Sequence, residues 1–199
     1  MKATVIGGAG FIGRRLCQVL VSRGDSVTAL DRNPVGPELT RQGVVPILGD
    51  LLEEKAVLFA CSKADVVFNL AGALGKWRTS LEELEVANTM AAGFVVTCAA
   101  MTGGGKVVHT STIGVTGPLP DGVDASEDYP PNPATDYQRT KLAGEDAALN
   151  AHNETGVPLV IVRPGFAYGP GDRHKLSLFK AVAKGRMILV NEGKSRLHP

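Results

Sequence analysis

A glycine-rich turn near the amino terminus constrains the fold more than any other feature of this sequence. Apolar residues at positions 2–6 lead into the spacing Gly7-x-x-Gly10-x-x-Gly13, and an amphipathic stretch follows from Phe11. This order is typical of a strand, a tight turn and a helix. The first glycine permits the turn, the second lets backbone approach a pyrophosphate, and the third lets the helix pack on the strand. We therefore predict a dinucleotide-binding turn, with the helix dipole and free N–H groups facing phosphates.

Strand-like and helix-like stretches alternate along the rest of the chain, which predicts an α/β fold with a doubly wound parallel sheet of the Rossmann type. The predicted strands are 2–6, 26–30, 44–48, 65–70, 106–111, 157–162 and 187–190, and the predicted helices are 11–23, 51–62, 80–101, 135–154 and 176–184. The prolines and glycine in segment 32–43 predict a loop or at most a broken helix. Segment 112–134 is rich in proline, glycine and acids, and its length favours a functional loop over a solvated surface excursion.

Ligands bind such sheets beyond the carboxyl ends of the strands, and two acids end strands there. Asp31 follows the glycines at close to the ~20-residue spacing at which a carboxylate meets the adenosine ribose. A carboxylate accepts hydrogen bonds from a diol and repels a 2′-phosphate, so Asp31 favours NAD over NADP. Arg32 could turn to a 2′-phosphate, and a loop-capping role for Asp31 stays open. Asp50 could accept from the adenine amino group or serve only its turn.

Composition indicates an ordinary globular protein. Lys and Arg total 21 against 20 Asp and Glu, a formal net charge of +1, which gives no field to attract nucleic acid or an anionic membrane. Cys17, Cys61 and Cys98 are widely spaced within apolar helical patterns, which predicts buried free thiols in a reducing compartment. No apolar run approaches the ~20 residues of a spanning helix, and no secretory signal is evident. We expect a cytoplasmic protein with no membrane or nucleic-acid partner.

Tyr137 and Lys141 lie four residues apart near the start of a predicted helix, and therefore on one face of it. A free phenol titrates near ~10, but a neighbouring cation stabilises the phenolate and lowers its pKa. By themselves the two side chains would usually be an exposed helix face. Thr112 follows the fifth predicted strand at the ligand edge, where its hydroxyl could bind the substrate oxygen that Tyr137 protonates or deprotonates.

Taken together, these motifs resemble the extended short-chain dehydrogenase/reductase family, in its NAD-dependent epimerase/dehydratase branch. The matching pieces occur in the family's order from end to end: Gly7-Gly8-Ala9-Gly10-Phe11-Ile12-Gly13, Asp31, Gly49-Asp50-Leu51, Asn69-Leu70-Ala71-Gly72, Asn88, Thr110-Ser111-Thr112, Tyr137-x-x-x-Lys141 and the run from Arg163-Pro164-Gly165 to Gly171-Asp172.

The resemblance implies a role for each matching position. Tyr137 would be the catalytic acid/base, Lys141 would lower its pKa and hold the nicotinamide ribose, and Thr112 would align the substrate. The residues implied to bind or border NAD are Gly7, Gly10, Phe11, Ile12, Gly13, Asp31, Arg32, Asp50, Leu51, Leu70, Ala71, Gly72, Asn88, Tyr137, Lys141 and Pro164.

Three departures from the family pattern bear on function. Ile6 replaces a Thr or Ser whose hydroxyl commonly ties the glycine turn, and losing that bond costs only about 1 kcal/mol. Thr116-Gly117 replaces the Tyr-Gly of many sugar-nucleotide members. Family members also run well past 199 residues, so we expect a dinucleotide-binding domain at 1–165 and only the start of a substrate-binding portion at 166–199.

The resulting functional prediction is an NAD-dependent oxidoreductase-type enzyme that acts on a substrate hydroxyl or ketone, most like a sugar-nucleotide epimerase/dehydratase. A 3β-hydroxysteroid dehydrogenase-like alcohol dehydrogenase is the alternative, with a sterol-like alcohol as substrate. A non-catalytic NAD-binding sensor or scaffold is a third interpretation, against which the retention of Thr112, Tyr137 and Lys141 argues. The resemblance also implies a possible homodimer through the helices nearest Asn88 and Tyr137.

Other candidate sites rank lower. Trp77 is interpreted as a loop aromatic packed on the domain, and the charged run Asp172–Lys175 as a solvated face that could instead hold a diphosphate. His109, on a buried strand, is predicted to be a satisfied core histidine. No grouping of His, Cys or Asp has the spacing of metal ligands.

Overall fold

A computed structural model describes residues 1–75, 79–120 and 122–187. Trp77 and its charged neighbours, Asp121 and nearly all of the strand predicted at 187–190 lie outside the described residues. The chain divides into two compact units, Met1–Arg163 and Pro164–Pro199. The division falls two residues before the boundary expected from the sequence, and the units are described separately below.

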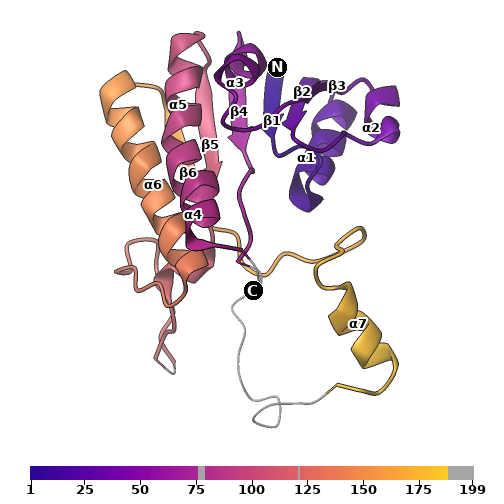
Figure 1. Ribbon diagram of the computed structural model, residues 1–199, viewed down its shortest axis with the longest axis vertical. Helices are drawn as coiled ribbons and strands as arrows, with labels where there is room; N and C mark the ends of the chain where they lie inside the picture. The colour runs from indigo at the N-terminus through magenta and orange to yellow at the C-terminus, as the bar shows by residue number, and fades with distance from the viewer. Residues whose placement is uncertain (76–78, 121, 188–199) are drawn as a thin grey trace. The chain divides into compact units, whose positions relative to one another are not determined.

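A six-stranded parallel sheet organises the first unit (Figure 1). The strands are β1 (Lys2–Ile6), β2 (Ser26–Asp31), β3 (Val45–Leu48), β4 (Val66–Asn69), β5 (Lys106–Thr110) and β6 (Leu159–Val162). Their order is β3-β2-β1-β4-β5-β6, and every neighbouring pair is parallel. The order reverses between β1 and β4, so the predicted doubly wound sheet is confirmed and its ligand edge lies beyond Ile6 and Asn69.

The helical segments of this unit are α1 (Phe11–Ser22), α2 (Pro37–Arg41), α3 (Glu54–Cys61), α4 (Leu81–Leu84), η1 (Glu85–Met90), α5 (Ala91–Met101), η2 (Ile113–Thr116) and α6 (Asp136–Thr155). Helix α2 lies in the segment predicted as a loop or broken helix, because Pro37 occupies the first helical turn, where its missing N–H costs no hydrogen bond. Thr135 caps α6 through a capping box with Gln138, as its position predicts.

Two apolar cores lie on opposite faces of the sheet. One joins α3, α5 and α6 to sheet residues that include Ile6, Val67 and Val107. The other joins α1 and α2 to alternate sheet residues such as Val5 and Val66. Helices α5 and α6 run side by side over the first face, while α1 packs on β1 and β2 and contacts α2 (Figure 1). The sheet is thus covered by helices on both faces.

The helical stretch Leu81–Met101 corrects one expectation from the sequence. It runs for 21 residues at a mean hydropathy of 1.4, long and apolar enough to cross a membrane, although no apolar run of that length was expected. Part of its apolar surface belongs to the core, where Ala91, Val95 and Val96 are completely buried. Its first turns contain glutamates, so the sequence shows no uninterrupted apolar run of this length.

The three cysteines are free and buried, as predicted. Burial raises the pKa of Cys17 to about 11, of Cys61 to about 12 and of Cys98 to about 11. The thiol form therefore dominates at neutral pH, and these residues pack as small apolar groups. Among the described residues, no group of His, Cys, Asp and Glu is arranged to hold a metal ion.

The second unit contains helix α7 (Leu176–Ala183) and a small aromatic cluster. Tyr168 contacts Phe166 and Phe179, with ring centroids 6.0 and 6.1 Å apart, and the Lys175 ammonium lies 4.1 Å from the Phe166 centroid. Asp172 is only 9% exposed and accepts hydrogen bonds from the backbone N–H groups that precede α7. This acid is thus part of a turn, not of the solvated face expected for it.

Candidate active site at the carboxyl edge of the sheet

The glycine turn closes tightly between β1 and α1. Gly7 has a φ of +87°, and a Cβ on Gly13 would lie 2.1 Å from the Gly7 carbonyl oxygen. A Cβ on Gly10 would meet only that same oxygen, at 3.1 Å, and otherwise open space. Gly13 therefore serves helix–strand packing, while Gly10 leaves backbone open to a ligand, as the spacing predicts.

The amino terminus of α1 is suited to an anion. Its N-cap, Gly10, provides no side-chain hydrogen bond to the first turn, so the N–H groups of that turn remain available. The Arg14 guanidinium instead donates to the Ala9 carbonyl at 2.9 Å and braces the turn. A 12-residue helix with free N–H groups at the switch point of a parallel sheet fits a pyrophosphate.

Asp31 ties the turn to the second strand. Its Oδ2 accepts from the Ala9 N–H at 3.0 Å, and its Oδ1 accepts from the Asn33 N–H at 2.8 Å. The first bond supplies a tie to the glycine turn that the Ile6 side chain cannot provide. The second is the loop-capping role that the sequence left open. Oδ1 also accepts from the Asn33 side-chain amide at 3.3 Å. An ionised carboxylate has about four acceptor sites, so Asp31 retains about one for a ribose hydroxyl.

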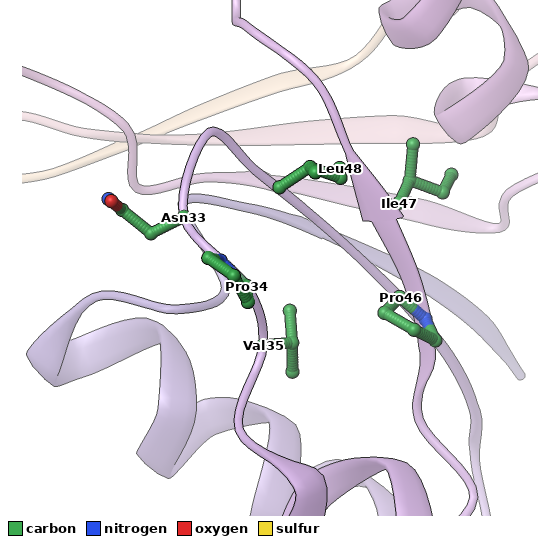
Figure 2. Close-up of a pocket in the computed structure, with 6 residues that line it drawn as sticks. All are labelled: Asn33, Pro34, Val35, Pro46, Ile47 and Leu48. Atoms are coloured by element: carbon green, nitrogen blue, oxygen red, sulfur yellow. The ribbon is translucent and has the colours of Figure 1, made fainter.

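An apolar hollow of about 240 Å³ lies next to Asp31 (Figure 2). Its walls come from the loop after β2 and from β3, and its lining residues are Asn33, Pro34, Val35, Pro46, Ile47 and Leu48. Arg32, one residue past Asp31, is exposed. Asp50, after β3, accepts from the Leu52 N–H at 3.0 Å, so it serves its turn while one oxygen stays free.

Asn88 fastens the segment after β4 to the helices above it. Its amide bonds both backbone groups of Ala73, accepting at 2.9 Å and donating at 3.1 Å, and its Nδ2 also lies 3.1 Å from the Thr140 hydroxyl. Asn88 belongs to η1, a π-helical turn inside the helix predicted at 80–101. The extra residue of a π-turn rotates a side chain out of the α-helical register, and such turns are frequent at functional sites.

Lys141 is buried with its ammonium directed at the strand ends. Its side chain is 4% exposed, and Nζ donates to the Thr110 carbonyl at 2.6 Å. Burial lowers the pKa of Lys141 to about 8, and the Glu145 carboxylate opposes this by raising it. A Cβ on Gly72 would lie 3.8 Å from Nζ, so the ammonium also borders the backbone after β4.

Tyr137 is half-buried one turn before Lys141 and lies against Gly75, where an added Cβ would be 3.1 Å from the Tyr137 Cβ. Burial raises the pKa of Tyr137. This is the opposite of the lowering that the sequence predicts from Lys141. The cause is that burial disfavours the charged phenolate.

Thr112 starts the 3₁₀ turn η2 at the end of β5. Its hydroxyl oxygen accepts from the Gly114 N–H at 3.2 Å, which leaves its O–H free to donate. Next to it, the Ser111 hydroxyl is buried without a partner among the described residues. Both hydroxyls lie at the edge where the sequence places the substrate oxygen.

The segment from Leu70 to Gly75 links the two halves of the site. A Cβ on Gly7 would lie 2.8 Å from the Ala71 nitrogen, so the glycine turn contacts its start. Lys141, Asn88 and Tyr137 contact it further along, at Gly72, Ala73 and Gly75. The structure thus brings the predicted phosphate-binding turn and the predicted acid/base pair onto the same six-residue stretch. Pro164 belongs to the second unit and is not placed in this site.

His109 is buried on β5 as predicted, but it is not satisfied. Its Nδ1 lies 3.4 Å from the Asn69 Nδ2, while Nε2 and the Asn69 Oδ1 have no partner among the described residues. Burial, and then the nearby Lys141 charge, lower the pKa of His109 to about 3. An amide N–H donates only to an unprotonated ring nitrogen, so the contact fits a neutral imidazole.

This buried histidine predicts an acid-sensitive fold. Between pH 6.5 and 3 the unfolded chain binds a proton at His109 and the folded chain does not, so stability falls as pH falls, by at most ~1.4 kcal/mol per pH unit. We expect His109→Gln, which cannot titrate, to flatten the dependence of urea-unfolding free energy on pH between about 6.5 and 4. An unchanged slope, with His152→Gln as the control, would contradict the assignment.

Glu145 and Arg163 are the site-bordering residues whose roles the sequence analysis did not predict. Glu145 is 3% exposed and accepts two hydrogen bonds from the Arg163 guanidinium, at 2.9 and 2.6 Å. One signal was available, because Tyr137, Lys141 and Glu145 follow at intervals of four and so share a helix face. The pairing with Arg163 could be found only once β6 was placed beside β5.

Comparison with known proteins places the chain among its relatives. The model of the NAD dependent epimerase/dehydratase family matches residues 3–197. The chain is 35% identical over 206 residues to the 2-alkyl-3-oxoalkanoate reductase of Stenotrophomonas maltophilia (strain K279a), covering 99% of this chain and 60% of that protein. It is 30% identical over 207 residues to the sterol-4-alpha-carboxylate 3-dehydrogenase, decarboxylating, of Bos taurus, covering 98% of this chain and 55% of that protein.

Among solved structures, the UDP-glucose 4-epimerase of Thermus thermophilus in complex with NAD superimposes with a TM-score of 0.81 at 29% identity, covering 94% of this chain and 64% of that one. The chain spans about 60% of the length of the first two curated relatives it matches. With the family model matched over nearly its whole length, and with the strand order and glycine turn in place, the chain belongs to the NAD-dependent epimerase/dehydratase family.

Proposed function

We propose that this chain binds NAD across the carboxyl edge of its sheet and forms the redox half of an enzyme acting on a substrate hydroxyl or ketone. The observation that carries the proposal is the shared segment 70–75, which contacts both the glycine turn and the side chains of Tyr137 and Lys141. The pyrophosphate would meet the open turn at Gly10, and Asp31 would accept from the adenosine ribose. A bound nicotinamide supplies the hydride acceptor or donor.

Three side chains of this site have different roles in proton transfer. Tyr137 takes the proton of the substrate hydroxyl during oxidation and returns it during reduction. The Lys141 ammonium stabilises the phenolate and donates to the cofactor ribose, while the free O–H of Thr112 holds the substrate oxygen. Because burial alone raises the pKa of Tyr137, cations near the phenol must bring it down in the working site, and Lys141 is the described candidate.

For the substrate, we propose a net alcohol dehydrogenase or ketone reductase. Thr116 stands where many sugar-nucleotide members have a tyrosine, and its hydroxyl is engaged by the Ile113 carbonyl at 2.8 Å within η2. It therefore offers no phenol to a sugar hydroxyl. The similarity to an oxoalkanoate reductase and a sterol dehydrogenase supports this interpretation. A sugar-nucleotide epimerase or dehydratase is the second candidate, supported by the likeness to the UDP-glucose 4-epimerase.

Cofactor turnover tests both candidates. The whole protein is incubated with NADH and 3-oxo acids, with NAD and sterol-like alcohols, and with NAD and sugar nucleotides, while absorbance of NADH is followed and products are analysed by mass spectrometry. Net NADH consumption or formation with a ketone or alcohol supports the reductase proposal. Epimerised sugar without net NADH change favours the second candidate. Tight NAD binding with no turnover in any arm would favour a sensor or scaffold.

Cofactor preference should follow Asp31. In Asp31→Asn the amide oxygen can still accept from the Ala9 N–H, but the charge that repels a 2′-phosphate is gone. We expect NAD affinity to fall about tenfold, since a hydrogen bond to a charged group contributes ~1.5–3 kcal/mol, while NADP affinity rises. Calorimetric titration with each cofactor measures the ratio, with Asp146→Asn as an exposed control. Wild-type protein that binds NADP more tightly than NAD would refute the preference.

A further inference from the structure

A buried ion pair lies one helical turn beyond Lys141. Glu145 is one helical turn further along α6, and its carboxylate is 3% exposed. The Arg163 guanidinium, just past the end of β6, grips it with Nε on Oε1 at 2.9 Å and Nη2 on Oε2 at 2.6 Å. A buried carboxylate paired with Arg163 thus lies on the same face of α6 as Lys141, whose ammonium belongs to the candidate active site.

The same guanidinium also holds the proline-rich loop that follows η2. Its Nη1 donates to the Glu127 carbonyl at 3.3 Å. Near the end of this loop, the Asn132 N–H donates to the Val115 carbonyl at 3.0 Å, which returns the chain to η2. Arg163 therefore connects the middle of the loop to the helix that carries Tyr137 and Lys141.

We propose that Glu145 is a positioning residue for the active site: locked by Arg163, its carboxylate keeps the Lys141 ammonium charged, while the same arginine fastens the loop at Glu127. The inference rests on the proposed function only in taking Lys141 as the cofactor-binding cation. The Glu145–Arg163 ion pair takes no direct part in hydride transfer, and the proposal assigns it a positioning role.

Two opposing effects act on the pKa of Lys141: burial, the larger, lowers it, and the Glu145 carboxylate raises it. Burial lowers the pKa of Lys141 to about 8, even with the Glu145 carboxylate raising it. The other groups facing the ammonium do not replace that carboxylate: His109 on β5 is neutral, and Asn88 on η1 is an uncharged amide. Tyr137 is protonated in this structure because burial raises its pKa. Removing Glu145 should therefore lower the pKa of Lys141 further.

Arg163 is needed because a carboxylate this deeply buried must be paired and hydrogen-bonded. Two parallel charge-assisted bonds satisfy both of its oxygens. The hydrogen bond to Glu145 raises the pKa of Arg163 in return. A guanidinium also has donors left for a third partner, which a lysine ammonium with its single nitrogen cannot place in the same plane. One of these remaining donors, Nη1, makes the contact with the Glu127 carbonyl.

The ammonium can be titrated directly. Whole protein without cofactor is labelled with ¹³C at lysine Cε, the Lys141 resonance is assigned with Lys141→Arg, and its shift is followed from about pH 6 to 11, a range that spans the ordinary lysine pKa. In Glu145→Gln we expect the midpoint to fall by about one pH unit, because an opposite charge within ~4–6 Å shifts a pKa by one to three units. Asp146→Asn, which removes an exposed acid of the same helix, should leave the midpoint unchanged. A wild-type midpoint in Glu145→Gln would overturn the inference.

Further variants control for misfolding and test the loop contact. Glu145→Gln alone leaves the buried charge of Arg163 without a partner, which could destabilise the fold. The double variant Glu145→Gln/Arg163→Gln removes both charges, and the Lys141 midpoint must fall in it as well. In Arg163→Lys, cleavage after Glu127 by a glutamyl endopeptidase should become several-fold faster; an unchanged rate would overturn the loop assignment. Because the titration uses no cofactor, it decides this inference independently of any failure to bind NAD.

Discussion

Gly13→Ala should abolish cofactor binding. The added Cβ would lie 2.1 Å from the Gly7 carbonyl oxygen and 2.9 Å from the Gly8 Cα, so neither neighbour is a flexible side chain that could yield. The helix must then move away from the strand, which carries the N–H groups of its first turn out of reach of the pyrophosphate. We expect at least a ~100-fold loss of NAD affinity, together with a loss of ~1–3 kcal/mol in unfolding free energy from overpacking.

The matched control is Gly36→Ala. Gly36 precedes α2, has an ordinary φ of −59° and has no atom within 4 Å of an added Cβ. Alanine there should change neither NAD affinity, measured by calorimetry, nor the urea midpoint appreciably. If Gly13→Ala bound NAD as tightly as Gly36→Ala does, the turn would not be the phosphate site.

Much of the fold was predictable because its signals are local. Each strand is a short apolar run bounded by turn residues, α1 has a periodic apolar stripe and α5 is apolar almost throughout, so the alternation and the parallel sheet follow from the sequence. Segment 32–43 was predicted only as a loop or at most a broken helix because proline and glycine usually mark loops, whereas Pro37 starts the short helix α2. The π-turn η1 has no sequence signal, since it depends on how Asn88 is held by Ala73 and Thr140.

The sequence predicted which residues form the site, but not their pKa values. The glycine turn, Asp31, Thr112, Tyr137 and Lys141 do lie along one edge, because parallel strands end together. Their pKa values depend on burial and on partners distant in sequence. Lys141 donates to Thr110, 31 residues away, and Glu145 pairs with Arg163, 18 residues away. No spacing rule within one helix could have given the raised pKa of Tyr137.

Tyr137→Phe should remove catalysis while leaving the cofactor bound. The variant keeps the ring against Gly75 and loses only the proton carrier, so we expect the rate of hydride transfer to fall by ~10²–10⁴-fold with NAD affinity nearly unchanged. Tyr129→Phe, in the loop after η2, is the control.

The pH dependence gives the sign of the proton transfer and a second test of the tyrosine. Oxidation of an alcohol needs the phenolate, so its rate should rise with pH through the pKa of Tyr137, whereas ketone reduction needs the phenol and should slow over the same range. Because burial raises this pKa, any midpoint below ~10 in the working enzyme measures how far Lys141 and the bound cofactor bring it down. Glu145→Gln should then move the midpoint upward, because a neutral Lys141 no longer stabilises the phenolate. If Tyr137→Phe kept full turnover, Tyr137 would not be the proton carrier. Another group would then transfer the proton, and the Thr112 hydroxyl would be the first to test.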